Sequence, residues 1–345
     1  MTRFDGALIG CGFFAQNHLH AWKDLEALDP GARLVAVCDT DPAKAKAAAE
    51  TFNIPRWYTD AETMFAAETL GFVDIATTMP SHRPLAELAA RHHVPMIVQK
   101  PFAPSFEDCL AIVAAAKAAN VPCMVHENFR FQTPMMKAAA VVKSGVIGAP
   151  VWGRFSFRTG YDVYANQPYL MRETHLIIQD LAIHLLDVAR VFMGEVERIS
   201  CETQQIRTGL VAEDMATMLL RHKSGAVSIV DCTYESKAQP DPFPQTLLTV
   251  EGRKGSLKVA SDFVMEVSVD GQMTASDIGA PLLAWTSKPW HAAQESVLNT
   301  QKHFIERLAA GLSHDTSGDD NLKTYALVMA AYAAAESHKA EMPIV

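Results

Sequence analysis

Short apolar runs alternate with amphipathic stretches through the first 125 residues of the chain. The runs have the length and composition of buried strands, and the stretches between them repeat apolar residues with helical spacing. The predicted strands cover residues 4–9, 33–38, 72–76, 95–98 and 122–125. The predicted helices run through Trp22, Leu25 and Leu28, open at Asp41-Pro42, and begin near Pro84 and Ser105. Strands that alternate with helices predict a parallel, doubly wound sheet.

The pattern changes after about residue 125. Predicted strands there follow one another through tight turns such as Lys223-Ser-Gly225, as in the hairpins of a largely antiparallel sheet. These strands cover residues 151–157, 217–221, 226–230 and 246–250, and the predicted helices cover 180–193, closed by Gly194, 291–309 and 319–337. We therefore predict an α/β protein with a doubly wound domain in residues 1–125 and, in residues 126–345, an α/β domain built on a large, mostly antiparallel sheet.

Composition and charge exclude several classes of protein. With 30 Lys and Arg against 39 Asp and Glu, the formal net charge of -9 would repel a phosphate backbone, so no nucleic acid partner is expected. No apolar stretch approaches the roughly 20 residues that a membrane span needs, so no membrane partner is expected. The six cysteines include no C-x-x-C pair, so neither a disulfide framework nor a structural zinc site is expected. These features predict a soluble cytoplasmic protein.

A glycine-rich turn follows the first predicted strand. Its sequence, Gly10-Cys-Gly12-Phe13-Phe14-Ala15, matches the G-x-G-x-x-A fingerprint of dinucleotide-binding Rossmann domains and leads into a predicted helix. Gly10 permits the tight turn, Gly12 lets a pyrophosphate approach the backbone, and Ala15 lets helix and strand pack closely. A glycine turn without a ligand is the alternative. The complete strand, turn and helix favour a dinucleotide site, with Phe13 and Phe14 beside the cofactor.

An acidic residue, Asp39, ends the second predicted strand. At this place a carboxylate accepts hydrogen bonds from the adenosine ribose and repels the 2′-phosphate of NADP, so Asp39 favours NAD as the cofactor. The alternative is that Asp39 caps the following helix, although Asp41 before Pro42 competes for that role.

Two further segments resemble a known family. Residues 75–82 read Ile-Ala-Thr-Thr-Met-Pro-Ser-His, and Gln-Lys-Pro follows the predicted strand 95–98. They are similar to the I-A-T-P-x-x-x-H segment and the Glu-Lys-Pro tripeptide of the Gfo/Idh/MocA family of glucose-fructose oxidoreductases and inositol dehydrogenases, and the resemblance spans essentially the whole chain. Thr78 replaces the family's proline, and Gln99 replaces its glutamate but can still hydrogen-bond a ribose hydroxyl. The cofactor-binding residues that the resemblance implies here are Thr77, His82, Gln99 and Lys100.

Two more motifs carry the same resemblance. The family's N-R-R-F segment is matched by Asn128-Phe-Arg130-Phe, which lacks one arginine and implies Asn128 near the cofactor and Arg130 as a scaffold or phosphate-side residue. The D-x-x-x-H signature is matched by Asp180-Leu-Ala-Ile-His184, whose spacing puts both side chains on one helical face. The resemblance implies that Asp180 and His184 are catalytic.

The resemblance implies an NAD-dependent dehydrogenase that acts on a carbohydrate. His184 is then the base that takes the hydroxyl proton, and Lys100 hydrogen-bonds the reacting oxygen and stabilises negative charge on it. Asp180 orients the imidazole or binds a neighbouring hydroxyl. Taken singly, Lys100 would most often be a solvated charge and His184 a core residue, but the cofactor fingerprint and the chain order favour a reaction centre.

The first strand of the second domain and the loop after it offer candidates to line the substrate pocket. Ordinary packing on the two faces of the sheet explains the same residues equally well. The candidates are Arg154, Phe155, Arg158, Tyr161 and Tyr164.

A metal site is the alternative interpretation of four side chains: Glu173, His175, Asp180 and His184. No H-E-x-x-H motif or thiolate pair accompanies them, and hydride transfer to nicotinamide needs no metal, so we expect none.

Three longer stretches, residues 124–134, 152–160 and 316–324, resemble family members that oxidise the branched pentose D-apiose to its lactone. Another sugar or a polyol such as inositol is the alternative substrate. A sugar-responsive regulator that binds nucleotide without turnover is the rival from another class, although such proteins usually lose the lysine or the histidine. The expected partners are a small carbohydrate and further copies of the chain, in a homo-oligomer (dimer or tetramer) of the kind that family members form through their sheet faces.

Overall fold

The chain folds into two compact units in the computed structural model, which describes residues 3–165 and 167–345. The first unit comprises Met1–Asn128 and Gln294–Leu322, and the second comprises Phe129–Ala293 and Lys323–Val345. Each unit has its own sheet and its own buried apolar core.

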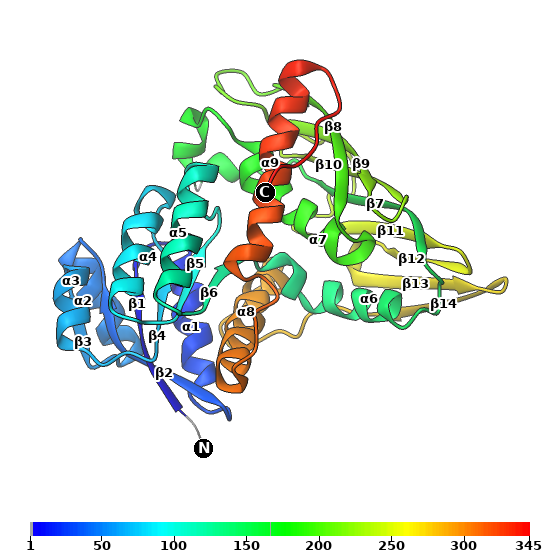
Figure 1. Cartoon of the computed structure of the whole chain (residues 1–345). Helices are drawn as coiled ribbons and strands as arrows, with labels where there is room; N and C mark the ends of the chain where they lie inside the picture. Colours follow the sequence, from blue (N-terminus) through cyan, green and yellow to red (C-terminus); the bar gives the residue numbers. More distant parts are fainter. Residues whose placement is uncertain (1–2, 166) are drawn as a thin grey trace. The chain divides into compact units, whose positions relative to one another are not determined.

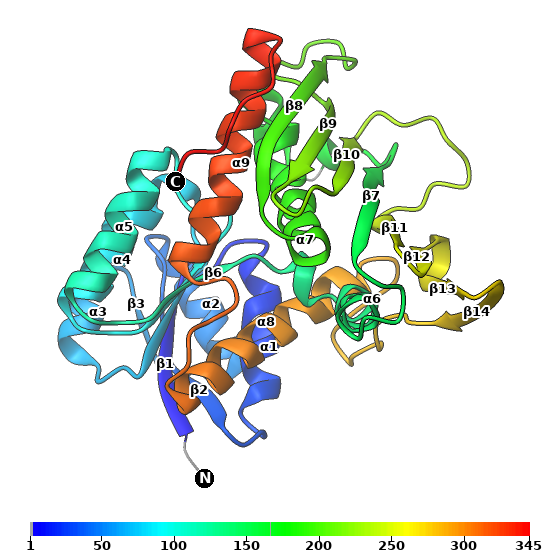
Figure 2. The same ribbon diagram turned by 45° about the vertical axis from the view of Figure 1, so that its right-hand side comes forward.

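The first unit is built on a parallel sheet, in which the described residues form six strands in the order β3-β2-β1-β4-β5-β6. The strands are β1 (Arg3–Ile9), β2 (Gly31–Cys38), β3 (Arg56–Tyr58), β4 (Phe72–Ile75), β5 (Met96–Gln99) and β6 (Cys123–His126). The helices are α1 (Ala15–Leu25), α2 (Pro42–Phe52), α3 (Ala61–Ala67), α4 (His82–Arg91) and α5 (Phe106–Ala118). Figures 1 and 2 show α4 and α5 side by side along this sheet. The predicted doubly wound parallel sheet is confirmed.

Local signals explain where these helices begin. Asp41 accepts a hydrogen bond from the backbone of Ala43 at 2.9 Å and caps α2, and Ser105 does the same for α5. The sequence did not predict β3 or α3, because elements of 3 and 7 residues are too short to show a hydrophobic period. The predicted range of α1 was too long. The helix ends at Leu25, and Leu28 lies beyond it, partly exposed.

The second unit is built on a larger sheet, in which the described residues form eight strands in the order β14-β13-β12-β11-β7-β10-β9-β8. The strands are β7 (Pro150–Arg158), β8 (Val196–Gln204), β9 (Met215–His222), β10 (Val227–Thr233), β11 (Leu247–Gly252), β12 (Gly255–Val259), β13 (Val264–Val269) and β14 (Gln272–Asp277). Among the described residues the pairings are antiparallel except for β7 with β10. The predicted, mostly antiparallel sheet is therefore confirmed.

One helix, α7 (Ile183–Met193), packs against β7 and β10 (Figure 2). It ends at Gly194, whose φ of 84° is the conformation that glycine adopts most easily. The sequence missed α6 (Thr133–Lys143) and the strands β8 and β12–β14, and the side chains of β14 are exposed throughout, so no apolar alternation marks that strand.

The boundary between the units differs from the predicted division at residue 125. Helices α8 (His291–Ala310) and α9 (Gly318–Ser337) lie close to their predicted ranges, but residues 294–322 pack with the first sheet. Phe304 of α8 contacts Phe72 of β4 with ring centroids 6.0 Å apart. A helical pattern does not show which sheet the helix covers, so the sequence could not place this segment. The roles of the two predicted domains in cofactor and substrate binding stay predictions.

No helix in the described part of the chain is long and apolar enough to cross a membrane. The six cysteines are buried free thiols in the residues that the structure describes.

Candidate active site

The glycine turn lies directly after β1, at the C-terminal ends of the parallel strands. Gly10 has a φ of 96°, and a Cβ there would lie 2.5 Å from the backbone oxygen of Ala76, so glycine is required. A Cβ on Gly12 would meet open space, which leaves the backbone accessible to a ligand. Ala15 is buried at the start of α1, whereas Phe13 is 80% exposed and Phe14 is partly exposed. This turn has the room and the helix amides that a pyrophosphate needs.

Asp39 holds the end of β2 against the glycine turn. Its Oδ2 accepts a hydrogen bond from the backbone of Cys11 at 2.7 Å, and its Oδ1 accepts one from the backbone of Asp41 at 2.9 Å. Because Asp41 caps α2, Asp39 is not the helix cap that the sequence left as an alternative. Its half-buried carboxylate at the strand end remains suited to a ribose.

His82 ties the loops after β4 and β5 together. Its Nε2 lies 3.1 Å from the carbonyl oxygen of Thr77, and its Nδ1 lies 3.1 Å and 3.2 Å from those of Pro101 and Phe102. Burial lowers the pKa of this fully buried histidine. His82 thus holds the two loops together, and its role at the cofactor stays a prediction.

The amide of Gln99 points into the first unit. Its Oε1 accepts the backbone N–H of Lys100 at 2.6 Å, and its Nε2 lies 3.0 Å from Nε2 of His18. Asn128 is also buried and donates to Oγ of Ser296 at 2.7 Å. Both ends of the Gln99 amide thus bind protein groups, and its ribose contact stays a prediction. Lys100 itself is half-buried at the end of β5.

In the second unit, Asp180 and His184 lie on consecutive turns of one helical segment. Residues Ile178–Ala182 form a π-helical turn that contains Asp180 and continues into α7 with His184. Such turns are rare and frequently occur at functional sites. Oδ2 of Asp180 accepts a hydrogen bond from the hydroxyl of Tyr234 at 3.0 Å, and burial raises the pKa of that tyrosine. Tyr234 thus holds the carboxyl group of Asp180 in place through a hydroxyl donor, a role that no sequence motif indicated.

Glu213 fixes the beginning of the same segment. Its Oε1 accepts hydrogen bonds from the backbone amides of Leu176 and Ile178 at 3.1 and 3.2 Å and from the hydroxyl of Tyr332 at 2.8 Å. The carboxylate therefore caps the π-helical turn from a distant part of the chain, which sequence spacing could not reveal.

A row of aromatic rings begins at His184. The buried imidazole stacks on Phe129, with ring centroids 3.9 Å apart and planes 4° apart. Phe129 occupies the position where the family motif has an arginine. The row continues through Phe157 to Phe243, on which Tyr161 stacks at 4.0 Å. Trp290 then packs edge-on against Phe243, with ring centroids 4.7 Å apart. Both residues lie in loops, and the sequence did not predict them because no motif includes them.

Of the predicted pocket residues on β7, Arg154 and Phe155 cannot line one pocket. Successive side chains of a strand point to opposite faces of the sheet. Phe155 is completely buried against Phe192 of α7, whereas Arg154 lies on the other face and donates to Asp231 at 2.9 Å. Arg158 lies on the face of Arg154, 3.6 Å from the same carboxylate. Phe155 is a core residue, and the two arginines bind a carboxylate of the sheet.

Tyr164, another predicted pocket residue, is buried. The side chain is 5% exposed, and its hydroxyl has no hydrogen-bond partner in the described residues. Its ring lies edge-on to Tyr234 at 6.4 Å, and the guanidinium of Arg207 lies 4.3 Å above it. Tyr164 is therefore buried between Arg207 and Tyr234, and its role in a substrate pocket stays a prediction.

Arg130 has a scaffold role rather than a phosphate role. Its Nε donates to Oδ2 of the buried Asp187 at 2.6 Å, and Oδ1 of Asp187 accepts from Thr324 at 3.0 Å. Arg190 donates to the same threonine at 2.7 Å. This network ties the η2 turn (Phe129–Phe131) to α7 and α9.

No group of three His, Cys, Asp or Glu side chains in the described residues could hold a metal ion. The ring of His175 instead lies edge-on to Tyr332 at 4.4 Å.

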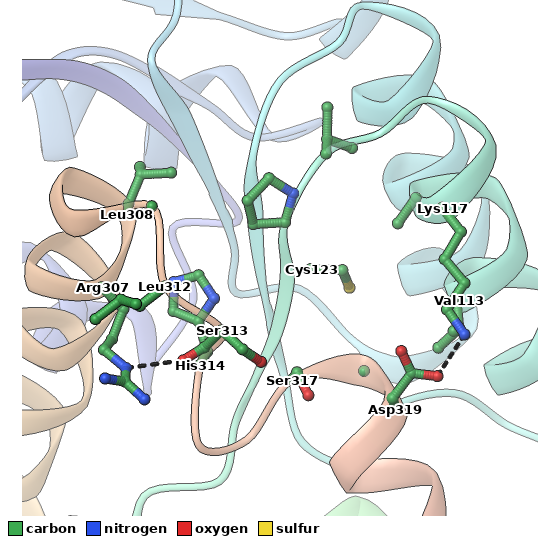
Figure 3. A pocket seen from close by; sticks show the side chains of 15 residues that line it. Val113, Lys117, Cys123, Arg307, Leu308, Leu312, Ser313, His314, Ser317 and Asp319 are labelled. Carbon is green, nitrogen blue, oxygen red and sulfur yellow. Dashed lines mark hydrogen bonds and ion pairs between the residues drawn. The ribbon is translucent and has the colours of Figure 1, made fainter.

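The first unit also contains a cavity of about 350 Å³, which Figure 3 shows between α5 and the segment joining α8 to α9. Lys117 and Asp319 form an ion pair of 2.6 Å at its rim, and Cys123 lies at its wall. Cys123 is the first residue of β6, so this cavity lies at the N-terminal ends of the parallel strands. The glycine turn lies at their C-terminal ends. No predicted site residue lines it.

A six-stranded parallel sheet in the described residues, with this glycine turn and an acidic residue ending β2, defines a dinucleotide-binding protein of the Rossmann class. Residues 4–127 match the family model described as "Oxidoreductase family, NAD-binding Rossmann fold", and residues 135–258 match the Gfo/Idh/MocA C-terminal domain. The chain belongs to the Gfo/Idh/MocA family, and its cofactor is NAD.

The relatives found agree with this assignment. D-apiose dehydrogenase of Rhizobium rhizogenes is 50% identical over 97% of this chain and 96% of its own length. D-apiose dehydrogenase of Paraburkholderia graminis is also 50% identical, over 97% of this chain and 88% of its own length. A solved oxidoreductase of Agrobacterium radiobacter, in complex with NAD+, L-tartaric acid and magnesium, is 49% identical with a TM-score of 0.96 and covers 99% of this chain and 98% of its own.

Proposed function

We propose that this protein is an NAD-dependent sugar dehydrogenase that oxidises D-apiose at its anomeric carbon to the lactone. The observation that carries the proposal is the 50% identity, over 97% of the chain, to relatives named D-apiose dehydrogenase. The residues needed for turnover, Lys100, Asp180 and His184, are present in the chain, which favours an enzyme over a regulator that binds nucleotide without turnover.

When bound, NAD would supply the hydride acceptor for oxidation of the anomeric carbon. The hydroxyl on that carbon loses its proton to His184, whose ring is held by the stack on Phe129. Lys100 hydrogen-bonds the same oxygen and stabilises the negative charge that develops there. Asp180, held by Tyr234, orients the imidazole or binds a neighbouring hydroxyl. Loss of one hydride and one proton from a cyclic hemiacetal gives a lactone.

The aromatic residues of the second unit provide a suitable wall for a small sugar. A sugar ring presents apolar C–H groups on its faces and hydroxyls at its edge. The rings of Tyr161, Phe243 and Trp290 offer apolar surface. These residues replace Arg154 and Phe155 in the proposed pocket.

The location and assembly of the protein complete the proposal. Free thiols suit the reducing cytoplasm, where we expect the protein. We expect a homo-oligomer, a dimer or tetramer, because the face of the large sheet opposite α7 bears exposed apolar side chains such as Leu219, which is 51% exposed. Light scattering of the purified protein measures its mass, and a monomer at micromolar concentration would exclude this assembly.

NADH absorbance with a panel of sugars tests the substrate. We expect the highest kcat/KM for D-apiose, and lower values for xylose, glucose and myo-inositol. A sugar that lacks a hydroxyl to which the site hydrogen-bonds leaves buried polar groups unpaired, which lowers kcat/KM. The product should be hydrolysed by base to an aldonic acid. Faster turnover of inositol, or a product that resists hydrolysis, would place the chain among the polyol dehydrogenases.

A further inference from the structure

A chain of buried polar side chains connects β4 with the backbone of Lys100. Asp74 of β4 is completely buried, and its Oδ2 lies 2.8 Å from Nδ1 of His18 in α1. Nε2 of His18 lies 3.0 Å from Nε2 of Gln99, at the end of β5. The Oε1 of the same glutamine accepts the backbone N–H of Lys100 at 2.6 Å. Each contact is of hydrogen-bond length, so proton positions along the chain depend on one another.

The backbone of Lys100 fixes those positions. A backbone N–H can only donate, so the atom of Gln99 that faces it is the oxygen, and the NH₂ group faces His18. The NH₂ group donates in turn, so Nε2 of His18 carries a lone pair and its proton lies on Nδ1, from where it is donated to Asp74. The arrangement requires an imidazole whose proton lies on Nδ1 and is donated to Oδ2 of Asp74.

The groups around this chain support the same assignment. Oδ2 of Asp74 also accepts hydrogen bonds from Nε1 of Trp22 at 2.7 Å and from Nε2 of Gln301 at 3.1 Å. Gln301 belongs to α8, in the segment that returns to the first unit. Donors from two helices thus hold Oδ2 of Asp74 in place as an acceptor. The other titratable side chain that faces His18 is His126 of β6, with ring centroids 4.3 Å apart.

We propose that Asp74, His18 and Gln99 are positioning residues that fix the backbone of Lys100, and that the amide of Gln99 lets them do so without taking up an additional proton. The proposal rests on the catalytic role of Lys100 proposed above. A carboxylate at position 99 would have only acceptors, and one of them would face the lone pair on Nε2 of His18. The contact would then form only after one more proton entered the buried cluster.

The position of the proton on His18 can be measured directly. In full-length protein labelled with ¹⁵N-histidine, with and without NAD+, we expect the nitrogen shifts of His18 to report protonated Nδ1 and unprotonated Nε2. At neutral pH, a proton on Nε2, or protons on both ring nitrogens, would overturn the proposal.

Two substitutions of similar size separate positioning from packing. Gln99→Met removes both hydrogen bonds. It should lower kcat by about tenfold at every pH, with KM for NAD within about twofold, because the backbone N–H of Lys100 loses its neutral side-chain acceptor. Gln99→Glu should give a new ionisation: kcat falls as pH rises, because loss of the shared proton sets the carboxylate against the lone pair. Gln272→Glu, which adds the same charge at an exposed position of β14, should keep the wild-type profile.

Wild-type kcat in Gln99→Met, or an unchanged pH profile in Gln99→Glu, would overturn the positioning role. The proposed function fails in a different way. If Lys100→Ala retained normal turnover, the catalytic role of Lys100 would be wrong and the positioning role would fall with it, while the nitrogen shifts of His18 would still decide the proton arrangement.

Discussion

The two units hold their predicted reactive residues in different ways. At the end of β5, Gln99 and the loop around His82 place polar groups against polar groups, and these hydrogen bonds fix the backbone from which Lys100 projects. At the beginning of α7, aromatic rings surround the reactive side chains: Phe129 covers His184, and Tyr234 holds Asp180.

The difference shows two ways of fixing a reactive group. A buried hydrogen-bond network is specific because each donor needs an acceptor, and it tolerates few substitutions. An aromatic wall fixes the plane of a ring by contact and leaves its polar edge available for chemistry. The first arrangement suits a residue whose backbone must not move, and the second suits a base that must exchange a proton.

The largest expected effect is the loss of either reactive group. Lys100→Ala and His184→Ala should each lower kcat by about 10² to 10⁴-fold, the usual range for a positioned acid or base. Binding of NAD+, measured by calorimetry, should persist in both variants. Near-normal turnover in a folded variant would show that the residue concerned has another role.

Asp39 tests the cofactor side of the first unit. Asp39→Ala should narrow the preference for NAD over NADP by about tenfold or more, because the carboxylate no longer repels the 2′-phosphate. The measurement is kcat/KM for both cofactors at saturating sugar. A wild-type enzyme that works better with NADP would contradict the ribose role of Asp39.

Tyr234 tests the second unit. Tyr234→Phe keeps the ring and removes the hydrogen bond to Asp180, so kcat should fall by about five- to tenfold with little change in stability. Tyr58→Phe, which removes a hydroxyl from the first unit where it binds Glu68, is the matched control and should leave kcat unchanged. Equal kcat values for the two variants would show that the hydroxyl of Tyr234 does not contribute to turnover.

The smallest expected effect concerns stability and leaves turnover at neutral pH unchanged. Burial lowers the pKa of His314 to about 4, so the unfolded chain binds a proton there before the folded one does. Above the ordinary histidine pKa, this difference does not lower the free energy of unfolding. As pH falls towards 4, the free energy of unfolding decreases by at most about 3 kcal/mol, because the unfolded chain binds the proton more tightly. Thermal unfolding of His314→Gln between pH 7 and pH 4, at about one-unit steps, should show a shallower acid loss than the wild type. Parallel curves would contradict this role.

The sequence by itself determined the order of the elements and the local motifs. The alternation of apolar runs, the cap at Asp41 and the turn at Gly10 depend on neighbouring residues, so they could be predicted from spacing. The sequence also placed Asp180 and His184 on one helix, because only a few residues separate them.

Tertiary structure decided which distant residues complete each site. Whether Phe155 faces a pocket or the core depends on the helix that covers its side of the sheet, and the partners of Gln99 come from other strands and helices. Phe243 and Trp290 lie in loops without a motif, and Glu213 reaches the π-helical turn from far along the chain. Contacts between residues distant in sequence arise only from the packing of whole elements, and local patterns carry no record of them.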